Sequence, residues 1–198
     1  MPSNNGTIFI TQYDYEGRFG LFGKFLDLLF RPAMGWGTAL SFDVLKRWIE
    51  RGELPRSQYL RFFSIGIITM FFFFIWLYHG LVPKMIAKHP EEVSMLSSFI
   101  SLEETVVVKW LWVIGLLEVL FAVVWLLYPT KRHLFALQMI IFPVLTISSF
   151  IASPSLWLAP FNPVTFNASL WVLSIVGFLL ANDLPSASSC RRARKEAA

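Results

Sequence analysis

Residues 60–82 read LRFFSIGIITMFFFFIWLYHGLV, and this stretch decides the class of protein. Only Arg61 and His79 interrupt it, and both lie near its ends. An α-helix needs about 20 apolar residues to cross the hydrocarbon core of a bilayer. The stretch therefore predicts a membrane-spanning helix, around which the rest of the chain can be interpreted.

Three further apolar stretches are long enough to cross the membrane after the first. We expect them at about 106–128, 133–153 and 167–182. The chain has 198 residues, 56% of them hydrophobic and 15% charged, whereas soluble domains carry about a quarter charged residues. The sequence thus predicts an all-α, four-helix transmembrane bundle over residues 59–183, and it excludes a soluble nucleic-acid-binding protein.

The distribution of lysine and arginine predicts how this bundle is oriented. Cations cluster before the first span, in the link between the second and third spans, and in a basic tail at 184–198. If four helices alternate, these regions share one side of the membrane, with the cations Lys46, Arg47, Arg51, Arg56, Arg61, Lys131, Arg132, Arg191, Arg192, Arg194 and Lys195. The other side has only Lys84, Lys88 and Lys109. We predict that both termini are cytoplasmic and that the membrane is a bacterial inner membrane.

Residues 1–58 contain no uninterrupted apolar run of spanning length. Their apolar periodicity predicts two short amphipathic helices, one over 18–31 that Pro32 ends and one that Ser41 caps and that ends before Pro55. Apolar faces with cationic flanks suit helices that lie on an anionic cytoplasmic leaflet. Packing on the protein's own cytoplasmic end and docking of a soluble partner remain alternatives.

Glu118 is the outstanding candidate for chemistry, since it lies about midway along the second span. A charged residue there costs at least ~2.5 kcal/mol on insertion scales, so we expect it to face the bundle interior in its protonated form. Gly115, one turn earlier, makes room beside it, and Pro143 leaves the carbonyl of Met139 as an acceptor. Glu118 is then either an interhelical hydrogen-bonding group, to that carbonyl or to Ser174, or a proton-handling or quinone-contacting group.

The segment HGLVPK at residues 79–84 is a second candidate site. We expect Gly80 and Pro83 to end the first helix and Lys84 to extend to the lipid headgroups. His79 either binds a carbonyl-bearing ligand or relays a proton, or it merely caps a loop carbonyl or contacts a headgroup. The rise per residue places His79 roughly 10 Å or more from Glu118, so direct pairing is not expected.

Other kinds of site find little support. His79 and His133 are expected near opposite faces of the membrane, so they cannot bind one haem iron. The segment HPEE at 89–92 matches no zinc-ligand spacing, and we predict no metal site. Cys190 is the one cysteine, which excludes an internal disulfide and dithiol chemistry.

The link over 154–166 is uncharged and rich in aromatic residues and proline. It suits an interfacial aromatic belt that leads into the fourth helix, with Asn167 as the N-cap. A lid over an outward-facing lipid or quinone pocket is the alternative.

Four of these segments occur together in a recognisable order: HGLVPK at 79–84, HPEE at 89–92, GLLE at 115–118 and APFNPVTFN at 159–167. In this order and spacing they resemble the DoxX-like integral membrane proteins over about residues 59–183. The positions that carry the resemblance are His79, Gly80, Pro83, Lys84, Glu118, Asn162, Pro163 and Asn167.

The resemblance implies a compact four-helix membrane bundle. Some similar proteins are the small membrane subunit of a thiosulfate:quinone oxidoreductase. Others associate with sulfur-transfer or superoxide-handling enzymes, or assist the maturation of membrane proteins. The matched positions are therefore candidates for structural signatures as well as for site residues.

These observations lead to two functional hypotheses. The first is an accessory or anchoring subunit of a membrane complex, redox-associated, with a protein partner at the cytoplasmic face. The second is a quinone-interacting oxidoreductase component in which Glu118 accepts a proton and His79 is a polar contact. A quinone is the one cofactor that the residues suggest, and both catalysis and homo-oligomerisation stay open.

Overall fold

The computed structural model describes residues 2–3, 6–7, 9–12, 18, 20–100, 102–158, 160 and 162–190. The predicted tail cations at 191–195, and Ala159 and Phe161 of the APFNPVTFN segment, lie outside these residues. The chain divides into two compact units, one of Met1–Gly52 with Ser186–Ala198 and one of Glu53–Pro185. Each unit is described by itself.

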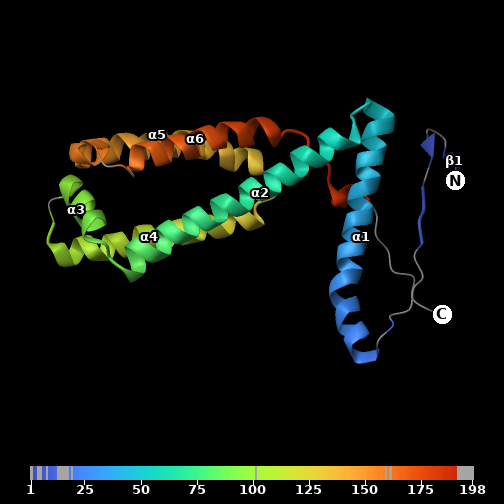
Figure 1. Cartoon of the computed structure of the whole chain (residues 1–198), viewed down its shortest axis with the longest axis horizontal. Helices are drawn as coiled ribbons and strands as arrows, with labels where there is room; N and C mark the ends of the chain where they lie inside the picture. The colour runs from blue at the N-terminus through green and yellow to red at the C-terminus, as the bar shows by residue number, and fades with distance from the viewer. Residues whose placement is uncertain are drawn as a thin grey trace. The chain divides into compact units, whose positions relative to one another are not determined.

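The Glu53–Pro185 unit is a helical bundle (Figure 1). In chain order it contains α2 (Pro55–His79), the π-helix η1 (Gly80–Ile86), α3 (Pro90–Phe99), α4 (Glu104–Leu127), α5 (Lys131–Ala152), the 3-10 helix η2 (Pro154–Leu158) and α6 (Pro163–Leu180). Among the described residues, four segments are long and apolar enough to cross a membrane: Pro55–Ile86, Glu104–Leu127, Lys131–Ala152 and Pro163–Leu180. The predicted all-α fold with four potential spans is confirmed.

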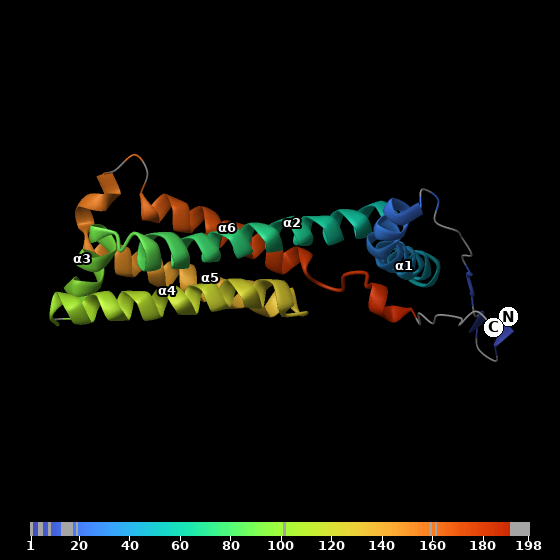
Figure 2. The same cartoon turned by 90° about the horizontal axis from the view of Figure 1, so that it is seen from below.

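The bundle is built from two pairs of helices. α2 packs along α4 and α5 packs along α6, and α3 lies at the end where η1 leads into it (Figures 1 and 2). Gly177 lets α6 approach α5 closely, because a Cβ atom there would overlap the ring of Phe135. The pairs then join through a dense cluster of aromatic side chains.

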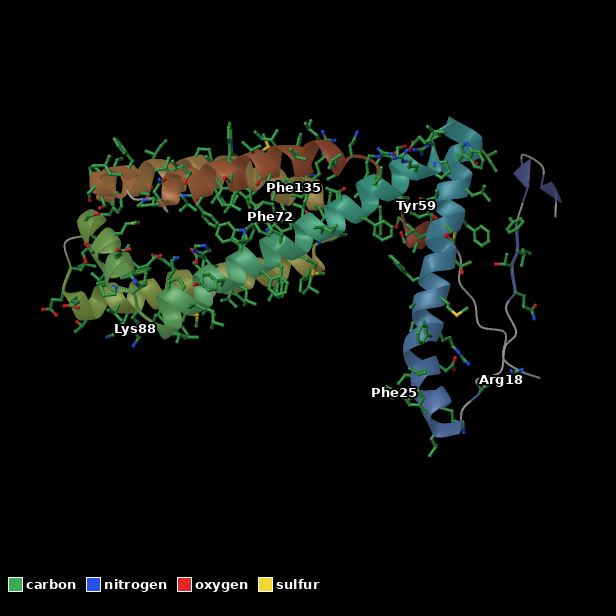
Figure 3. All side chains as sticks on the ribbon, in the orientation of Figure 1. Arg18, Phe25, Tyr59, Phe72, Lys88 and Phe135 are labelled. Carbon is green, nitrogen blue, oxygen red and sulfur yellow. The ribbon has the colours of Figure 1, made fainter. Side chains whose placement is uncertain are left out.

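Phe72 is the centre of this aromatic cluster and is fully buried. Its ring centroid lies 5.1 Å from that of Trp125 and 6.1 Å from those of Phe135 and Phe142. Figure 3 shows Phe72 and Phe135 in the space between α2 and the α5–α6 pair. These rings fill the bundle interior at this level, and aliphatic side chains of all four spanning helices surround them.

The first spanning helix does not end at Gly80 and Pro83, as the sequence suggested. It continues as η1 through Ile86, with Ala87 N donating to the carbonyl of Val82, five residues earlier, at 2.8 Å. Pro83 has no N–H for the carbonyl of His79, and a π-helical turn is one way for a helix to accommodate such an interruption. The chain therefore extends the helix past the proline.

The fourth spanning helix begins earlier than predicted. Its N-cap is Asn162, whose Oδ1 accepts from Thr165 N at 2.9 Å, and Asn167 lies within the first turns of α6. Pro163 occupies the first helical position, where a missing N–H is harmless. Asn-Pro at 162–163 is thus the stronger start signal.

The unit formed by Met1–Gly52 and Ser186–Ala198 contains one long helix rather than two short ones. α1 (Gly20–Arg51) continues through Pro32, since the two flanking segments are each helical and the proline removes only one backbone hydrogen bond. Ser41 is not an N-cap, because its hydroxyl donates to the carbonyl of Gly37 at 2.9 Å within the helix. The predicted break at Pro32 is therefore wrong.

Short elements complete this unit. β1 (Pro2–Ser3) and β2 (Gly6–Thr7) pair antiparallel, and η3 (Ala187–Ser189) packs on α1. Asp43 of α1 anchors η3, since its carboxylate accepts from Ser186 N and from Arg47 Nε, both at 2.9 Å. The segment after the bundle thus folds back onto the helix that precedes the bundle.

Candidate functional site

Glu118 of α4 is largely buried and has a cationic partner from another helix. Its carboxylate Oε2 lies 3.0 Å from Lys84 Nζ, and the two side chains are 16% and 10% exposed. A carboxylate and an ammonium this close stabilise each other's charged forms in a medium of low polarity. The sequence singled out both residues but did not predict the pair.

Lys84 points into the bundle and not toward the headgroups, so that expectation is wrong. The reason lies in η1, where Lys84 Nζ donates to the carbonyl of His79 at 3.4 Å. Pro83, four residues after His79, has no N–H that could donate a hydrogen bond to that carbonyl. A second carboxylate, Glu92 of α3, lies 3.6 Å from the ammonium. Lys84 therefore connects α2, α3 and α4.

Two glycines allow this close approach. A Cβ atom on Gly115 would lie 2.7 Å from the carbonyl oxygen of Gly80, and one on Gly80 would lie 2.5 Å from that of Gly115. The backbones of η1 and α4 thus touch beside the Lys84–Glu118 pair. The room that Gly115 was expected to leave for the carboxyl group is taken by the opposing backbone.

The polar cluster opens into a cavity of about 310 Å³ between the helices. Glu118, Lys84, Glu92 and His79 supply its charged and titratable groups. The other walls are mostly aromatic and aliphatic and come from α2, α3, α4, α5 and α6: Ile75, Trp76, Met95, Leu96, Phe99, Leu111, Ile114, Phe142, Leu145, Ser149, Pro163, Phe166, Asn167 and Leu170. This combination suits an apolar molecule with a polar group.

Besides Oε2 of Glu118, whose neighbour is the ammonium of Lys84, two lining residues carry buried polar atoms without a hydrogen-bond partner among the described residues. They are Nε1 of Trp76 on α2 and Oγ of Ser149 on α5. Buried polar atoms are normally paired, because an unpaired one costs about 1–3 kcal/mol. An indole N–H only donates and a hydroxyl can donate, so an oxygen acceptor in the cavity would suit both.

The structure brings some of the predicted residues together and separates others. The ring of His79 lies 5.5 Å from that of Phe166, and both line the cavity with Asn167. His79 and Glu118 do not pair directly, as predicted from the rise per residue, but Lys84 bridges them through the carbonyl of His79. Asn162 caps α6 and is not among the cavity-lining residues.

Pro143 plays a different part from the one expected. The carbonyl of Met139 accepts a hydrogen bond, but from Trp171 Nε1 of α6 at 3.0 Å rather than from Glu118. The hydroxyl of Ser174, the other expected partner, has one proton to donate and lies 3.2 Å from Gln138 Oε1 and 2.8 Å from the carbonyl oxygen of Leu170. These contacts join α5 to α6. Neither expected group therefore pairs with Glu118, whose partner is Lys84.

Glu92, Trp76 and Ser149 are the site residues that the sequence did not identify. A signal for Glu92 was present, because Pro90 followed by two acidic residues is typical of a helix start. His89 is the N-cap of that helix, with Nδ1 accepting from Glu91 N at 3.4 Å. The HPEE segment thus begins a helix that covers the cavity, and among the described residues no group of side chains matches a metal site.

Comparison with known proteins agrees with this architecture. Residues 73–175 match the model of the DoxX-like family, and they include η1, the Lys84–Glu118 pair and the start of α6. Over 204 residues the sequence is 31% identical to the Bacillus subtilis (strain 168) protein named Uncharacterized membrane protein YndG. The match covers 98% of this chain and 59% of that relative, so the chain spans little more than half of the relative's length. No solved structure matches the chain.

Proposed function

The chain belongs to the DoxX-like family of membrane proteins, and from this premise we propose that it is an accessory membrane subunit that binds a quinone-type molecule in its bundle. The observation that carries the proposal is the cavity itself. Its walls are apolar and aromatic, yet Trp76 and Ser149 each bring a buried polar atom that lacks a partner among the described residues. A flat apolar ring with carbonyl acceptors supplies what both the walls and these atoms lack.

The charged end of the cavity adds a second reason. A quinone takes up electrons and protons when it is reduced, and a carboxylate such as that of Glu118, paired with Lys84 at the cavity wall, is a suitable proton-exchanging group. Glu118 holds the ammonium of Lys84 in place, and Lys84 is the cationic donor for a carbonyl oxygen. This assigns the two residues distinct roles in binding.

The size of the cavity limits the ligand. About 310 Å³ lies at the lower end of the range for small-molecule sites, roughly 300–1,000 Å³. Such a space holds a substituted ring but not a long isoprenoid chain. We therefore expect ring chemistry, rather than tail length, to determine the affinity.

The test is native mass spectrometry of the full chain in lipid nanodiscs titrated with short-tail ubiquinone and menaquinone analogues. Lys84→Met should weaken retention of the quinone about tenfold, because a charge-assisted hydrogen bond contributes about 1.5–3 kcal/mol. Lys109→Met is the matched control, since it removes an exposed lysine of α4 that does not line the cavity. Absence of quinone binding to the unmodified chain, or equal losses in both variants, would contradict the proposal.

A separate observation favours α1 as the docking element of this accessory subunit. Leu21, Phe22, Phe25 and Leu28 in its first half are all at least 60% exposed. At about 100° per residue, Phe30, which is 59% exposed, lies about 140° around the axis from Phe25. One flat bilayer surface cannot cover both of these sides, so we propose that the side around Phe25 binds a partner protein.

Affinity purification from the native membrane tests this docking role. Phe22→Glu combined with Phe25→Glu should remove a co-purifying protein, since charges on the apolar stripe oppose burial. Leu45→Glu, on the other half of α1, is the control. If the double variant retained every partner, the docking role of the stripe would be wrong.

We also propose that both termini are cytoplasmic and that the membrane is a bacterial inner membrane, as the cation distribution indicates. Cys190 offers a direct test, because the chain has no other cysteine. A membrane-impermeant thiol reagent should label it in inverted inner-membrane vesicles and leave it unlabelled in intact spheroplasts. The reverse pattern would invert the topology.

A further inference from the structure

We propose that Glu92 of α3 is an internal competitor for Lys84, and that a ligand acceptor binds Lys84 by replacing Glu92 and releasing α3. The proposal rests on the quinone-binding function of the cavity and concerns its regulation. It follows from the number of donors on Lys84, from the packing of α3, and from the residues that α3 contributes to the cavity.

Three oxygens surround the ammonium of Lys84. An ammonium carries three N–H groups. The oxygens around it are Glu118 Oε2 at 3.0 Å, the His79 carbonyl at 3.4 Å and Glu92 Oε1 at 3.6 Å. A carbonyl oxygen of a ligand that binds Lys84 therefore competes with these oxygens for the three N–H groups.

Glu92 is the partner that gives way most easily. Its 3.6 Å separation exceeds the distance of a good hydrogen bond, whereas Glu118 lies at 3.0 Å. The His79 carbonyl is fixed by the backbone, and Glu118 belongs to a spanning helix that touches η1 through Gly80 and Gly115. α3 has only ten residues and none of them is buried, so few contacts oppose its displacement.

Displacement of α3 would also change access to the cavity. Met95, Leu96 and Phe99 of this helix form part of the cavity wall. The Glu92–Lys84 contact therefore holds that wall in place, and an occupant that takes over Lys84 loosens it. Coupling of this kind is reciprocal. If binding of a ligand favours the release of α3, then release of α3 favours binding of the ligand by the same factor.

The first test measures affinity for the same short-tail quinones by native mass spectrometry in nanodiscs. Glu92→Gln should bind about threefold to fivefold more tightly than the unmodified chain, because a weak competing ion pair has been removed. Glu91→Gln is the matched control: it makes the same change on the exposed neighbouring residue and should leave the affinity unchanged. Weaker binding by Glu92→Gln would make Glu92 a ligand contact and overturn the proposal, and so would equal binding.

The second test needs no quinone. In a Cys190→Ser background, Ser149→Cys places a nearly isosteric thiol in the cavity wall, and its reaction with a small methanethiosulfonate reports opening. Adding Glu92→Gln should raise this rate several-fold, whereas Glu91→Gln should not. Equal rates in the two variants would overturn the release of α3.

The two tests separate this proposal from the one on which it rests. If no variant binds a quinone but Glu92→Gln speeds the labelling of the Ser149→Cys thiol, the quinone-binding function fails and so does competition for it. If quinone binds and Lys84→Met weakens it, while Glu92→Gln alters neither affinity nor labelling, the binding function stands and the competitor role is wrong.

Discussion

The bundle interior contains two contrasting regions: the aromatic level, which is the cluster of rings around Phe72, and the charged level, which is the cavity around Lys84. Phe72 packs with three other aromatic rings at centroid distances of about 5–6 Å, and Phe72, Trp125 and Phe135 are fully buried. Around Lys84, the same spanning helices enclose a cavity of about 310 Å³ with charged groups on its wall. The contrast indicates that one level provides stability and that the other is kept open at a cost in stability.

The largest effect should come from the aromatic level. Phe72→Ala removes a fully buried ring and should lower the free energy of unfolding by about 4 kcal/mol, from lost burial and the new void. Reversible unfolding in mixed detergent micelles, followed by tryptophan fluorescence, measures this. Phe74→Ala, on an exposed face of α2, is the control and should cost far less. Similar losses would mean that the aromatic cluster is not the stabilising level.

At the charged level, substitutions of Lys84 and Glu118 should have non-additive effects on the free energy of unfolding. Lys84→Met leaves the carboxylate of Glu118 without its cation inside the bundle, at a cost of about 3 kcal/mol. The double variant Lys84→Met with Glu118→Gln should recover much of this loss, because no unpaired charge remains. Unfolding of the two single variants and the double variant in micelles gives the coupling energy. Additive losses would show that the two residues do not interact.

The glycine contact beside the Lys84–Glu118 pair should give a smaller and local effect. Gly115→Ala brings a methyl group within 2.7 Å of the Gly80 carbonyl and 3.1 Å of Lys84 Cβ, so the helices must separate. We expect a loss of about 2 kcal/mol in the same unfolding assay. Gly66→Ala is the control, since its Cβ would meet no atom within 4 Å and alanine favours a helix. If both variants were equally stable, the close approach at Gly115 would be irrelevant.

These two levels also differ in how far the sequence predicted them. Spanning helices follow from composition and length, so the fold was predictable from stretches such as residues 60–82. Glu118 was identifiable because a carboxylate is costly within a span. The partner of Glu118 was not predictable, since the local sequence indicated that the helix ends at Pro83, whereas its continuation as η1 places Lys84 inside the bundle. The sequence also failed to predict that α1 continues through Pro32. The preference of the residue before a proline for a non-helical conformation was outweighed by the helical segments on both sides.

A carboxylate outside the spanning segments gives the smallest effect and a contrast with Glu118. Burial opposes ionisation of Asp43, but hydrogen bonds from the Ser186 amide and from Arg47 outweigh it, so the pKa of Asp43 lies below its ordinary value. A lowered pKa in the folded state means that ionised Asp43 stabilises the contact above the ordinary aspartate pKa. This stabilisation is lost as the pH falls through the lowered value.

Asp43→Asn should therefore free η3 from α1 slightly more often at neutral pH. We expect a loss of about 0.5 kcal/mol, hence about a twofold faster reaction of Cys190 with dithiodipyridine, which also reacts in acid. Cys190 reports this contact because its thiol lies 3.4 Å from the Ala39 carbonyl of α1. The ratio of the rates should fall to one in acid, below the pKa of Asp43. A ratio that stays constant with pH would show that the charge of Asp43 does not hold η3 on α1.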